Sequence, residues 1–309
     1  MTELSGMANI LIDCDPGHDD AVAILLAESL SNLVSITTVA GNSSLINTTR
    51  NALSVTELIG RDIPVHAGAS HALDGQARDA RHVHGAGGFG GVSLAEPGRV
   101  VASEDAVAHI LTQARAVEAL WLVAIGPLTN IALAVRKEPD LASRVAGLAI
   151  MGGSTGSGNA TATAEFNIWA DPQAAKEVFA AGFDPIVCGL NLTQQFLSDD
   201  DLISELRAAE RSIPSFVADL YTYMHARMED LIGVRQAALH DPCAVLAVTH
   251  PDLFEFVSLH VDVETEGELT RGMTVFDQRR TRRGKAAPNC KVATYIDQGA
   301  ARELLLNTL

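Results

Sequence analysis

Long apolar runs are absent from this chain of 309 residues. No run reaches the roughly 18–20 residues that a membrane helix needs. The opening segment, MTELSGMANILID, also lacks the basic start and apolar stretch of a secretory signal peptide. The sequence therefore predicts a cytoplasmic protein without a membrane partner.

Positive charge is scarce. Lys and Arg number 22 against 38 Asp and Glu, which gives a formal net charge of −16. A surface of this sign repels nucleic acid and anionic membranes, so we expect no nucleic-acid partner. One basic run, QRRTRRGK at 278–285, interrupts this pattern and is expected to be a solvated loop.

Cysteine is rare and widely spaced, with four residues at Cys14, Cys188, Cys243 and Cys290. No CxxC pair is present to predict a zinc site or a redox pair. We therefore expect four buried thiols in a reducing compartment.

Apolar, β-branched runs alternate with helical patterns along most of the chain. Hydrophobic residues make up 47% of it, which is typical of a packed globular protein. Strands are expected at 10–13, 34–41, 64–68, 119–126, 145–153 and 184–190, and later at 258–264, 272–277 and 291–297. Helices are expected at 19–30, 46–60, 104–116, 128–137 and 172–181, with a last helix ending at Leu309. This alternation predicts one α/β domain over 1–309, with an open, mostly parallel but mixed, Rossmann-like sheet and helices on both faces.

Two segments are too rich in glycine and polar residues for regular structure, namely 69–103 and 152–167. Long loops inside a compact domain are often functional. Composition alone leaves open whether these two serve a site or only lie on the surface.

Four aspartates crowd the end of the first predicted strand, in the sequence DCDPGHDD. Asp13 and Asp15 share a face of the strand, and Asp19 and Asp20 open the following helix. Ligands bind at this edge of open parallel sheets. A hard divalent cation, Ca²⁺ or Mg²⁺, would relieve the repulsion between the carboxylates. The alternative is helix capping with one or two salt bridges.

A distant carboxylate, Asp241 in LHDPCAVLAV, is a candidate to complete the cation site. It stands at the start of an apolar helical pattern. The alternative is that Asp241 is only a helix N-cap followed by proline at the first helical position.

Six motifs, in this order and spacing, resemble the inosine-uridine-preferring nucleoside hydrolase family: DCDPGHDD, TTVAGN, GPLTN, MGG, NATATAEFNIWADPQAA and HDPCAVLA. The similarity spans residues 10 to 248, and the later strands are compatible with it. The resemblance implies an open α/β sheet, a tightly bound Ca²⁺ and hydrolysis of the N-glycosidic bond of ribonucleosides to free base and ribose. It also implies a homodimer or homotetramer, in which the basic run at 278–285 is a possible interface.

The resemblance assigns the metal ligands residue by residue. Asp15, Asp20, Asp241 and the backbone carbonyl of Ile125 would bind calcium. Family members often have threonine at position 125, and a ligand from the backbone tolerates that change. Asp15 would also be the general base that accepts a proton from the attacking, calcium-held water.

The resemblance also assigns the sugar contacts. Asp19 and Asn167 would hold the ribose 2′- and 3′-hydroxyls, Asn159 and Glu165 would reach the 5′-hydroxyl, and Met151 would pack on the sugar. Two further residues complete this pocket in the same way: Asn42 would line it, and Asp13 would orient the metal ligands.

Histidines are the candidates for contact with the departing base. The resemblance makes His240 the residue that protonates it, and the alternative is a supporting hydrogen bond beside the metal. It places His84 near the base and gives no clear role to His18. A helix carrying Tyr221, Tyr223, His225 and Arg227 would cover the base, and we expect at least two of these side chains to be core residues.

These residue types suit the chemistry. Cleavage of the C1′–N bond builds oxocarbenium character on the sugar, as in glycoside hydrolysis. Carboxylates and amide oxygens beside the ring stabilise that charge, while a general base activates the water.

Two other functions are compatible with an aspartate cluster. A Mg²⁺-dependent phosphohydrolase needs a cationic clamp for phosphate, and no Lys or Arg lies near DCDPGHDD in the sequence. A non-catalytic nucleoside- or sugar-binding protein is disfavoured because Asp15, Asp20, Asn167 and Asp241 occur together. Release of free ribose from a panel of nucleosides separates the three functions.

Overall fold

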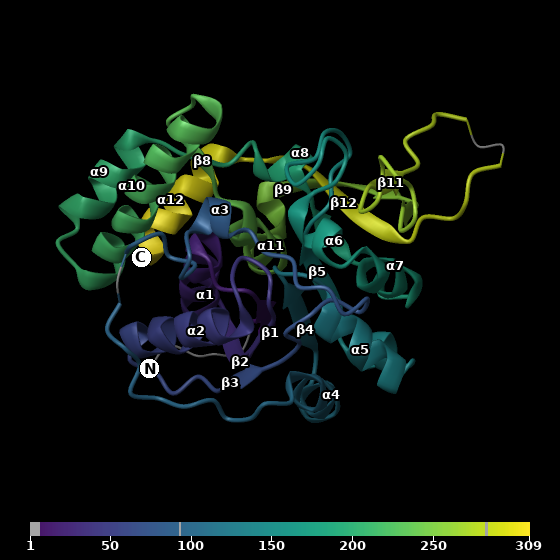
Figure 1. Cartoon of the computed structure of the whole chain (residues 1–309), viewed down its shortest axis with the longest axis horizontal. Coiled ribbons are helices and arrows are strands. Elements are labelled where there is room, and N and C mark those ends of the chain that lie inside the picture. Colours follow the sequence, from purple (N-terminus) through teal and green to yellow (C-terminus); the bar gives the residue numbers. More distant parts are fainter. Residues whose placement is uncertain (1–6, 93, 282–283) are drawn as a thin grey trace.

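An eight-stranded sheet runs through the molecule in the order β3-β2-β1-β4-β5-β6-β12-β9 (Figure 1). The computed structural model describes residues 7–92, 94–281 and 284–309. The strands of this sheet are β1 (Asn9–Cys14), β2 (Asn32–Thr38), β3 (Val65–Ala67), β4 (Leu120–Ala124), β5 (Gly147–Met151), β6 (Ile186–Cys188), β9 (Phe254–Leu259) and β12 (Cys290–Ile296).

All neighbouring strands in this sheet pair in parallel except β9, which is antiparallel to β12 at one edge. The expectation of an open, mostly parallel but mixed α/β sheet is therefore confirmed. Two small antiparallel pairs lie outside this sheet, β7 (Leu197–Ser198) with β8 (Ala237–Ala238) and β10 (Val261–Val263) with β11 (Thr274–Phe276).

Helices cover both faces of the sheet. They are α1 (His18–Leu30), α2 (Leu45–Ile59), α3 (Arg81–His84), α4 (Ala106–Ala116), α5 (Thr129–Lys137), α6 (Phe166–Ala170), α7 (Pro172–Ala180), α8 (Leu190–Thr193), α9 (Asp200–Ala208), α10 (Ser212–Ile232), α11 (His240–Thr249) and α12 (Gln298–Thr308), with short 3₁₀ turns at Leu141–Arg144 and Pro251–Leu253. The side chains of β1 alternate between two apolar clusters, as the pleat of a strand requires. Ile10 and Ile12 pack with α1, α2 and α11, and Leu11 packs with α4, α5 and α7.

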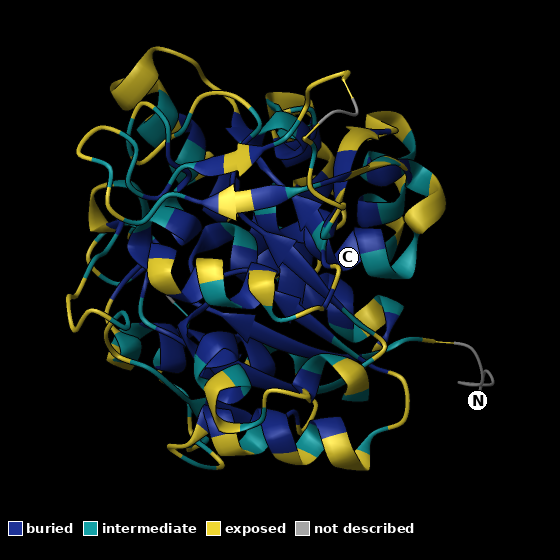
Figure 2. Ribbon diagram, turned by 90° about the vertical axis from the view of Figure 1, so that its right-hand side faces the viewer, coloured by how far each residue is buried: buried dark blue, intermediate teal, exposed yellow. Residues whose placement is uncertain are grey.

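The sheet is therefore buried between two helical layers, which Figure 2 shows as a dark interior with exposed residues on the outer helix faces. Because the strands are buried on both faces, their residues form short apolar runs rather than an alternation of apolar and polar residues.

The C-terminal part departs from expectation in one place. The pattern at 258–264 predicts a single strand, but the structure divides it between β9, which pairs with β12, and β10, which pairs with β11. The two pieces belong to different sheets, and alternation of side chains cannot reveal a change of partner.

Several smaller expectations can be compared with the structure. All four cysteines are buried free thiols, as expected. No helix among the described residues is long and apolar enough to span a membrane. The first six residues, and Arg282 and Arg283 of the basic run, lie outside the described residues.

The chain order of the strands creates a switch point beside β1. From β1 the chain moves outward to β2 and β3, and it then returns to the other side of β1 to form β4, β5 and β6. The loops that leave the carboxyl ends of β1 and β4 separate to opposite faces there, which makes a crevice suited to ligands.

Candidate active site

Asp15 lies at this crevice, immediately after β1. Its side chain is completely buried, and its Oδ2 accepts a 2.6 Å hydrogen bond from the backbone N–H of Asn42. Its Oδ1 is also buried and has no hydrogen-bond partner among the described residues. One oxygen of a buried carboxylate is thus left to interact with something that the protein itself does not supply.

Two glycines form the walls around Asp15. A Cβ atom on Gly41 would lie 2.1 Å from Asp15 Oδ2, and one on Gly126 would lie 2.6 Å from Asp15 Oδ1. Distances this short are not tolerated between atoms that are not bonded. The motifs TTVAGN and GPLTN therefore contain glycine where the chain passes closest to the Asp15 carboxylate.

Asp20 is fixed by the turn that precedes α1. Its Oδ2 accepts hydrogen bonds from the Gly17 N–H at 2.8 Å and from Asn42 Nδ2 at 2.9 Å, and its Oδ1 accepts one from the Asp15 N–H at 3.1 Å. The same carboxylate therefore stabilises the start of the helix and joins β1 to the loop after β2.

Asp241 reaches the same place from the first turn of α11, which packs against α1. It is buried and is not the N-cap of its helix, because Leu239 occupies that position. One carboxylate oxygen from each of Asp19, Asp20 and Asp241 lies within 4.8 Å of the others. The sequence predicts Asp15 rather than Asp19 in the metal-ligand set, and Asp15 is next to this group through its contacts with Asn42 and Asp20.

The carboxylates raise one another's proton affinity. Burial, followed by the charge of Asp20, raises the pKa of Asp15 well above its usual range. Burial and the charge of Asp19 raise the pKa of Asp241 in the same way, and those two causes raise the pKa of Asp20 to about 7. Burial is the first cause for all three carboxylates and neighbouring negative charge is the second. A group of hard oxygen donors beside an unpartnered carboxylate fits a divalent cation.

Asp13, two residues before Asp15, is buried in a hydrogen-bond network of its own. Its Oδ1 accepts hydrogen bonds from Thr37 Oγ1 at 2.6 Å and from Asn130 Nδ2 at 2.8 Å, whereas its Oδ2 is buried without a partner. Burial raises its pKa to about 6, although both hydrogen bonds act in the opposite direction. Asn130 also binds the Thr38 carbonyl, so this network holds the ends of β1 and β2 together.

Asn167, on the short helix α6, closes the other side of the crevice. Its Nδ2 donates to the carbonyl of Ile125 at 2.9 Å and to that of Met151 at 3.1 Å. These two residues lie at the carboxyl ends of β4 and β5. These two hydrogen bonds fix the Asn167 side chain at the switch point, next to the Ile125 carbonyl that is predicted to bind metal.

Glu165 and Asn159, both predicted to reach the 5′-hydroxyl, are engaged with backbone amides. Glu165 is buried and caps α6, with its carboxylate accepting hydrogen bonds from the N–H groups of Asn167, Ile168 and Gly153. Asn159 is exposed, and its Oδ1 accepts a hydrogen bond from the N–H of Phe166 at 2.9 Å.

Comparison with known proteins shows the family of the chain. The family model described as inosine-uridine preferring nucleoside hydrolase matches residues 10–303. The chain belongs to this family. It is an enzyme that hydrolyses the N-glycosidic bond of ribonucleosides.

Individual relatives agree with this assignment. The chain is 40% identical to the pyrimidine-specific ribonucleoside hydrolase RihA of Shewanella woodyi, and 38% identical to RihA of Escherichia coli O9:H4, over 97% of each chain. Among solved structures, the purine-preferring ribonucleoside hydrolase from Gardnerella vaginalis has a TM-score of 0.90 at 30% identity, over 97% of each chain.

Three histidines of this nucleoside hydrolase, His18, His84 and His240, lie near the carboxylates. His240 Nδ1 lies 2.7 Å from Thr193 Oγ1, and His84 Nδ1 lies 3.0 Å from His18 Nδ1. Burial lowers the pKa of all three histidines, to about 4 for His84. Sequence patterns do not single out Thr193, because one hydroxyl in NLTQQF carries no signal.

Helix α10 packs beside these histidines. Its Tyr221 and His225 side chains are buried, which confirms the expectation that at least two of the four marked residues are core residues. Tyr223 stacks on His18 with ring centroids 5.2 Å apart, and Arg227 donates to the His82 carbonyl of α3. The helix is therefore joined to the loop region 69–103. Residues 85–87 and 89–92 of this loop and Arg50 and Asn51 of α2 line a hollow of about 390 Å³.

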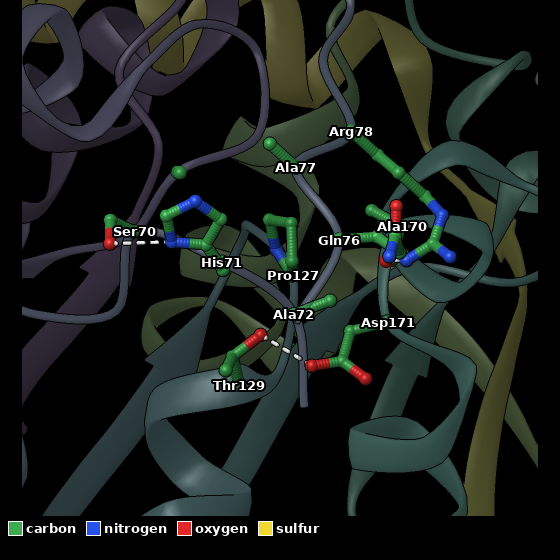
Figure 3. Close-up of a pocket in the computed structure, with 11 residues that line it drawn as sticks. Ser70, His71, Ala72, Gln76, Ala77, Arg78, Pro127, Thr129, Ala170 and Asp171 are labelled. Atoms are coloured by element: carbon green, nitrogen blue, oxygen red, sulfur yellow. Dashed lines mark hydrogen bonds between the residues drawn. The ribbon is translucent and has the colours of Figure 1, made fainter. Parts of the chain in front are cut away.

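A separate cavity of about 10 Å³ lies close to the crevice (Figure 3). Ala40 and Pro127 line it, and each precedes or follows a glycine that contacts Asp15. The volume is enough for about one water molecule and far too small for a nucleoside. This cavity is therefore not the substrate site.

The close approach of Gly126 to Asp15 gives a direct test. In Gly126→Ala, the new methyl group must displace the Asp15 carboxylate, so kcat/KM for ribose release from a nucleoside is expected to fall about 100-fold. In the control Gly299→Ala, the nearest atom to the new Cβ is at an ordinary 3.5 Å, and activity is expected to stay at the wild-type level. Wild-type activity in Gly126→Ala would contradict the tight packing of Asp15.

Proposed function

We propose that this nucleoside hydrolase binds one Ca²⁺ through Asp15, Asp20, Asp241 and the backbone carbonyl of Ile125. The observation that carries the proposal is the buried, unpartnered Oδ1 of Asp15, which lies next to the carboxylate group of Asp19, Asp20 and Asp241. Oxygen donors of this kind suit a hard cation better than zinc, which prefers nitrogen and sulfur ligands. Ca²⁺ rather than Mg²⁺ suits a site made largely by the protein, because Mg²⁺ usually retains several waters.

When bound, the ion would polarise the attacking water and offer coordination positions to sugar hydroxyls. Asp15 is the general base that accepts the proton of this water. Its position supports the role, because Oδ2 is held by the Asn42 N–H while Oδ1 stays unpartnered. Burial, followed by the charge of Asp20, raises the pKa of Asp15, and a cation bound beside these carboxylates would lower it again.

The ribose is held by Asp19 and Asn167 through its 2′- and 3′-hydroxyls. Asn167 can do this because its Nδ2 donates to the Ile125 and Met151 carbonyls, which leaves Oδ1 to accept a hydrogen bond from a ribose hydroxyl. Asn42 and Met151 form the walls of this sugar pocket. Negative and dipolar oxygens around the ring stabilise the oxocarbenium charge that develops at C1′.

His240 donates a proton to the departing base. The Thr193 hydroxyl can accept a hydrogen bond from Nδ1–H, or donate to Nδ1 and so leave the proton on Nε2. The first arrangement suits an acid, because a protonated imidazole donates Nδ1–H to Thr193 and becomes neutral when Nε2–H passes to the base. His84 lies near the base and is the second candidate donor, with His18 as its neighbour.

We further propose that pyrimidine ribonucleosides are the preferred substrates, since the relatives at 38–40% identity carry that specificity in their names. The purine-preferring enzyme from Gardnerella vaginalis, which has the same fold, is 30% identical. We also propose a cytoplasmic homodimer or homotetramer, and the four buried free thiols support the reducing compartment.

A nucleoside panel tests the proposed function. We expect the protein to release ribose from uridine and cytidine with a kcat/KM at least about tenfold higher than from inosine and guanosine, which corresponds to roughly 1.4 kcal/mol of transition-state discrimination. Free ribose is measured by reducing-sugar assay. Equal or higher rates with the purine nucleosides would contradict the base preference, and no ribose from any nucleoside would contradict the function.

The general-base role predicts a large loss in Asp15→Asn, which keeps the size of the side chain. We expect kcat for uridine to fall roughly 10³-fold, because both the base and a charged ligand are lost. Asp62→Asn is the matched control, since the Asp62 side chain is fully exposed and should leave kcat unchanged. An Asp15→Asn enzyme within about tenfold of wild type would show that another group accepts the proton.

The leaving-group role of His240 is separated from structural effects by the choice of substrate. His240→Ala is expected to lower kcat far more for uridine than for p-nitrophenyl riboside, whose leaving group is a stable anion and needs no proton. Thr193→Val, which removes the partner of Nδ1, should show the same pattern more weakly. Equal losses on both substrates in His240→Ala would assign His240 to the metal site or the fold.

A further inference from the structure

His18 and His84 meet edge to edge beside the turn between β1 and α1. Their Nδ1 atoms are 3.0 Å apart, and the ring centroids are 5.1 Å apart with planes that differ by 28°. This centroid separation is close to the largest that two imidazole rings with nitrogens at 3.0 Å can have. The two nitrogens therefore point at each other, as a hydrogen bond near the plane of the rings requires.

The surroundings of both rings hold them in this position. His18 is buried, and Tyr223 of α10 stacks on it with ring planes 9° apart. His84 lies over Gly17, where an added Cβ atom would be only 2.5 Å from its Nδ1. Distances this short are not tolerated between atoms that are not bonded. The missing side chain at Gly17 is therefore what allows His84 to reach His18.

The contact between the two Nδ1 atoms allows two arrangements of hydrogen. An N–H···N bond needs Nδ1–H on one ring and a bare Nδ1 on the other, and a neutral imidazole has hydrogen on only one nitrogen. If His18 donates, His84 carries its own hydrogen on Nε2. If His84 donates, His18 carries its hydrogen on Nε2.

The two Nε2 atoms have different environments, which distinguishes these arrangements. His18 Nε2 is buried and has no hydrogen-bond partner among the described residues. A hydrogen there would be a buried donor without an acceptor, which is rare in folded proteins. His84 is partly exposed, so a hydrogen on its Nε2 can meet water or a ligand. The arrangement in which His18 donates therefore gives every N–H of the pair an acceptor.

We propose that His18 is a positioning residue, which donates Nδ1–H to His84 and so keeps a hydrogen on His84 Nε2 as a donor to the departing base. This inference rests on the proposed place of His84 beside the base. Negative charge builds on the oxygen and nitrogen atoms of the base as the C1′–N bond breaks. A donor that is already oriented stabilises this charge without reorganisation. His84 keeps its hydrogen in this role, whereas His240 gives up a proton.

The hydrogen positions can be measured in the wild-type protein without reference to activity. Nitrogen-15 chemical shifts of the histidine rings, recorded with Ca²⁺ present, distinguish N–H from a bare ring nitrogen. We expect N–H at Nδ1 and a bare Nε2 for His18, and the reverse for His84. The His18→Leu and His84→Ala variants assign the signals. Any other pattern, including exchange between the two arrangements, would overturn the proposal.

Activity on two substrates tests whether the oriented donor is used. His18→Leu cannot donate, so kcat/KM for uridine is expected to fall about tenfold, as for the loss of one hydrogen bond. Activity on p-nitrophenyl riboside, whose leaving group is a stable anion, should stay within about twofold of wild type. Equal losses on the two substrates would show that His18 only supports the fold, against the proposal.

The position of the donor can be tested with two amide side chains. His18→Asn places an amide near the position of Nδ1, where it can still donate to His84, and should recover most of the activity on uridine. If His18→Leu does not fold, His18→Gln, whose amide reaches the position of Nε2 instead, is measured in its place with the same expectation. Failure of His18→Asn to exceed these variants on uridine would overturn the proposal.

A double-mutant cycle tests whether His18 acts through His84. In an His84→Ala background, His18→Leu should have little further effect on uridine, because the donor that it orients is already absent. Losses that multiply in the double variant would assign His18 to a different role, and so would an His84→Ala enzyme with wild-type activity.

His66→Leu is the matched control for lost packing. His66 is also buried, with Nδ1 2.8 Å from the Ser103 hydroxyl, a ring stacked on His109, and a buried Nε2 that has no partner in the described part of the chain. It lies on β3, at the edge of the sheet. We expect a lower melting temperature, as in His18→Leu, with the wild-type ratio of activities on the two substrates. A selective loss on uridine in His66→Leu would overturn the proposal.

The wild-type protein separates this proposal from the proposed function. If the wild type released ribose from no nucleoside, the proposed function would fail, while the nitrogen shifts would still test the hydrogen positions. If it cleaves nucleosides, equal losses on the two substrates in His18→Leu overturn only the role of His18. Where inosine is cleaved faster, inosine replaces uridine.

Discussion

Repulsion between buried carboxylates at the carboxyl end of β1 is the constraint on which this site depends. Asp15, Asp20 and Asp241 are buried, and each has a raised pKa because burial and neighbouring negative charge act together. The protein donors that reach Asp15 and Asp20 are backbone N–H groups and the amide of Asn42, which orient charge but do not neutralise it. A cation bound between the carboxylates would replace their mutual repulsion by attraction to the ion. The free energy that the repulsion costs the protein without an ion would then favour binding.

The fold supplies this arrangement through elements far apart in the chain. The switch point of the sheet brings the ends of β1 and β4 together, and α11 packs on α1 so that Asp241 meets Asp19 and Asp20. Gly41 and Gly126 then allow two loops to close on Asp15. The Asp15, Asp20 and Asp241 side chains are thus buried and held in place before substrate binds. A preorganised site of this kind loses little free energy to reorganisation during the reaction.

Much of the fold and of the candidate site could be predicted from the sequence, because the patterns that indicate them lie within short segments of the chain. Periodic apolar patterns indicated the parallel sheet, and DCDPGHDD indicated a cation site before any geometry was known. The division of 258–264 between β9 and β10 could not be predicted, because pairing partners lie far along the chain. Neither could the Thr193–His240 contact or the capping by Glu165, since both depend on where a loop folds back rather than on spacing.

The central claim, that the carboxylate group holds calcium, is tested most directly by calcium titration of chelator-treated protein in a calorimeter. We predict one Ca²⁺ per chain, with a higher melting temperature in excess Ca²⁺ because binding favours the folded state. Zinc binding at one ion per chain without calcium binding would contradict the account. So would full ribose release in excess chelator, with a melting temperature that does not respond to calcium.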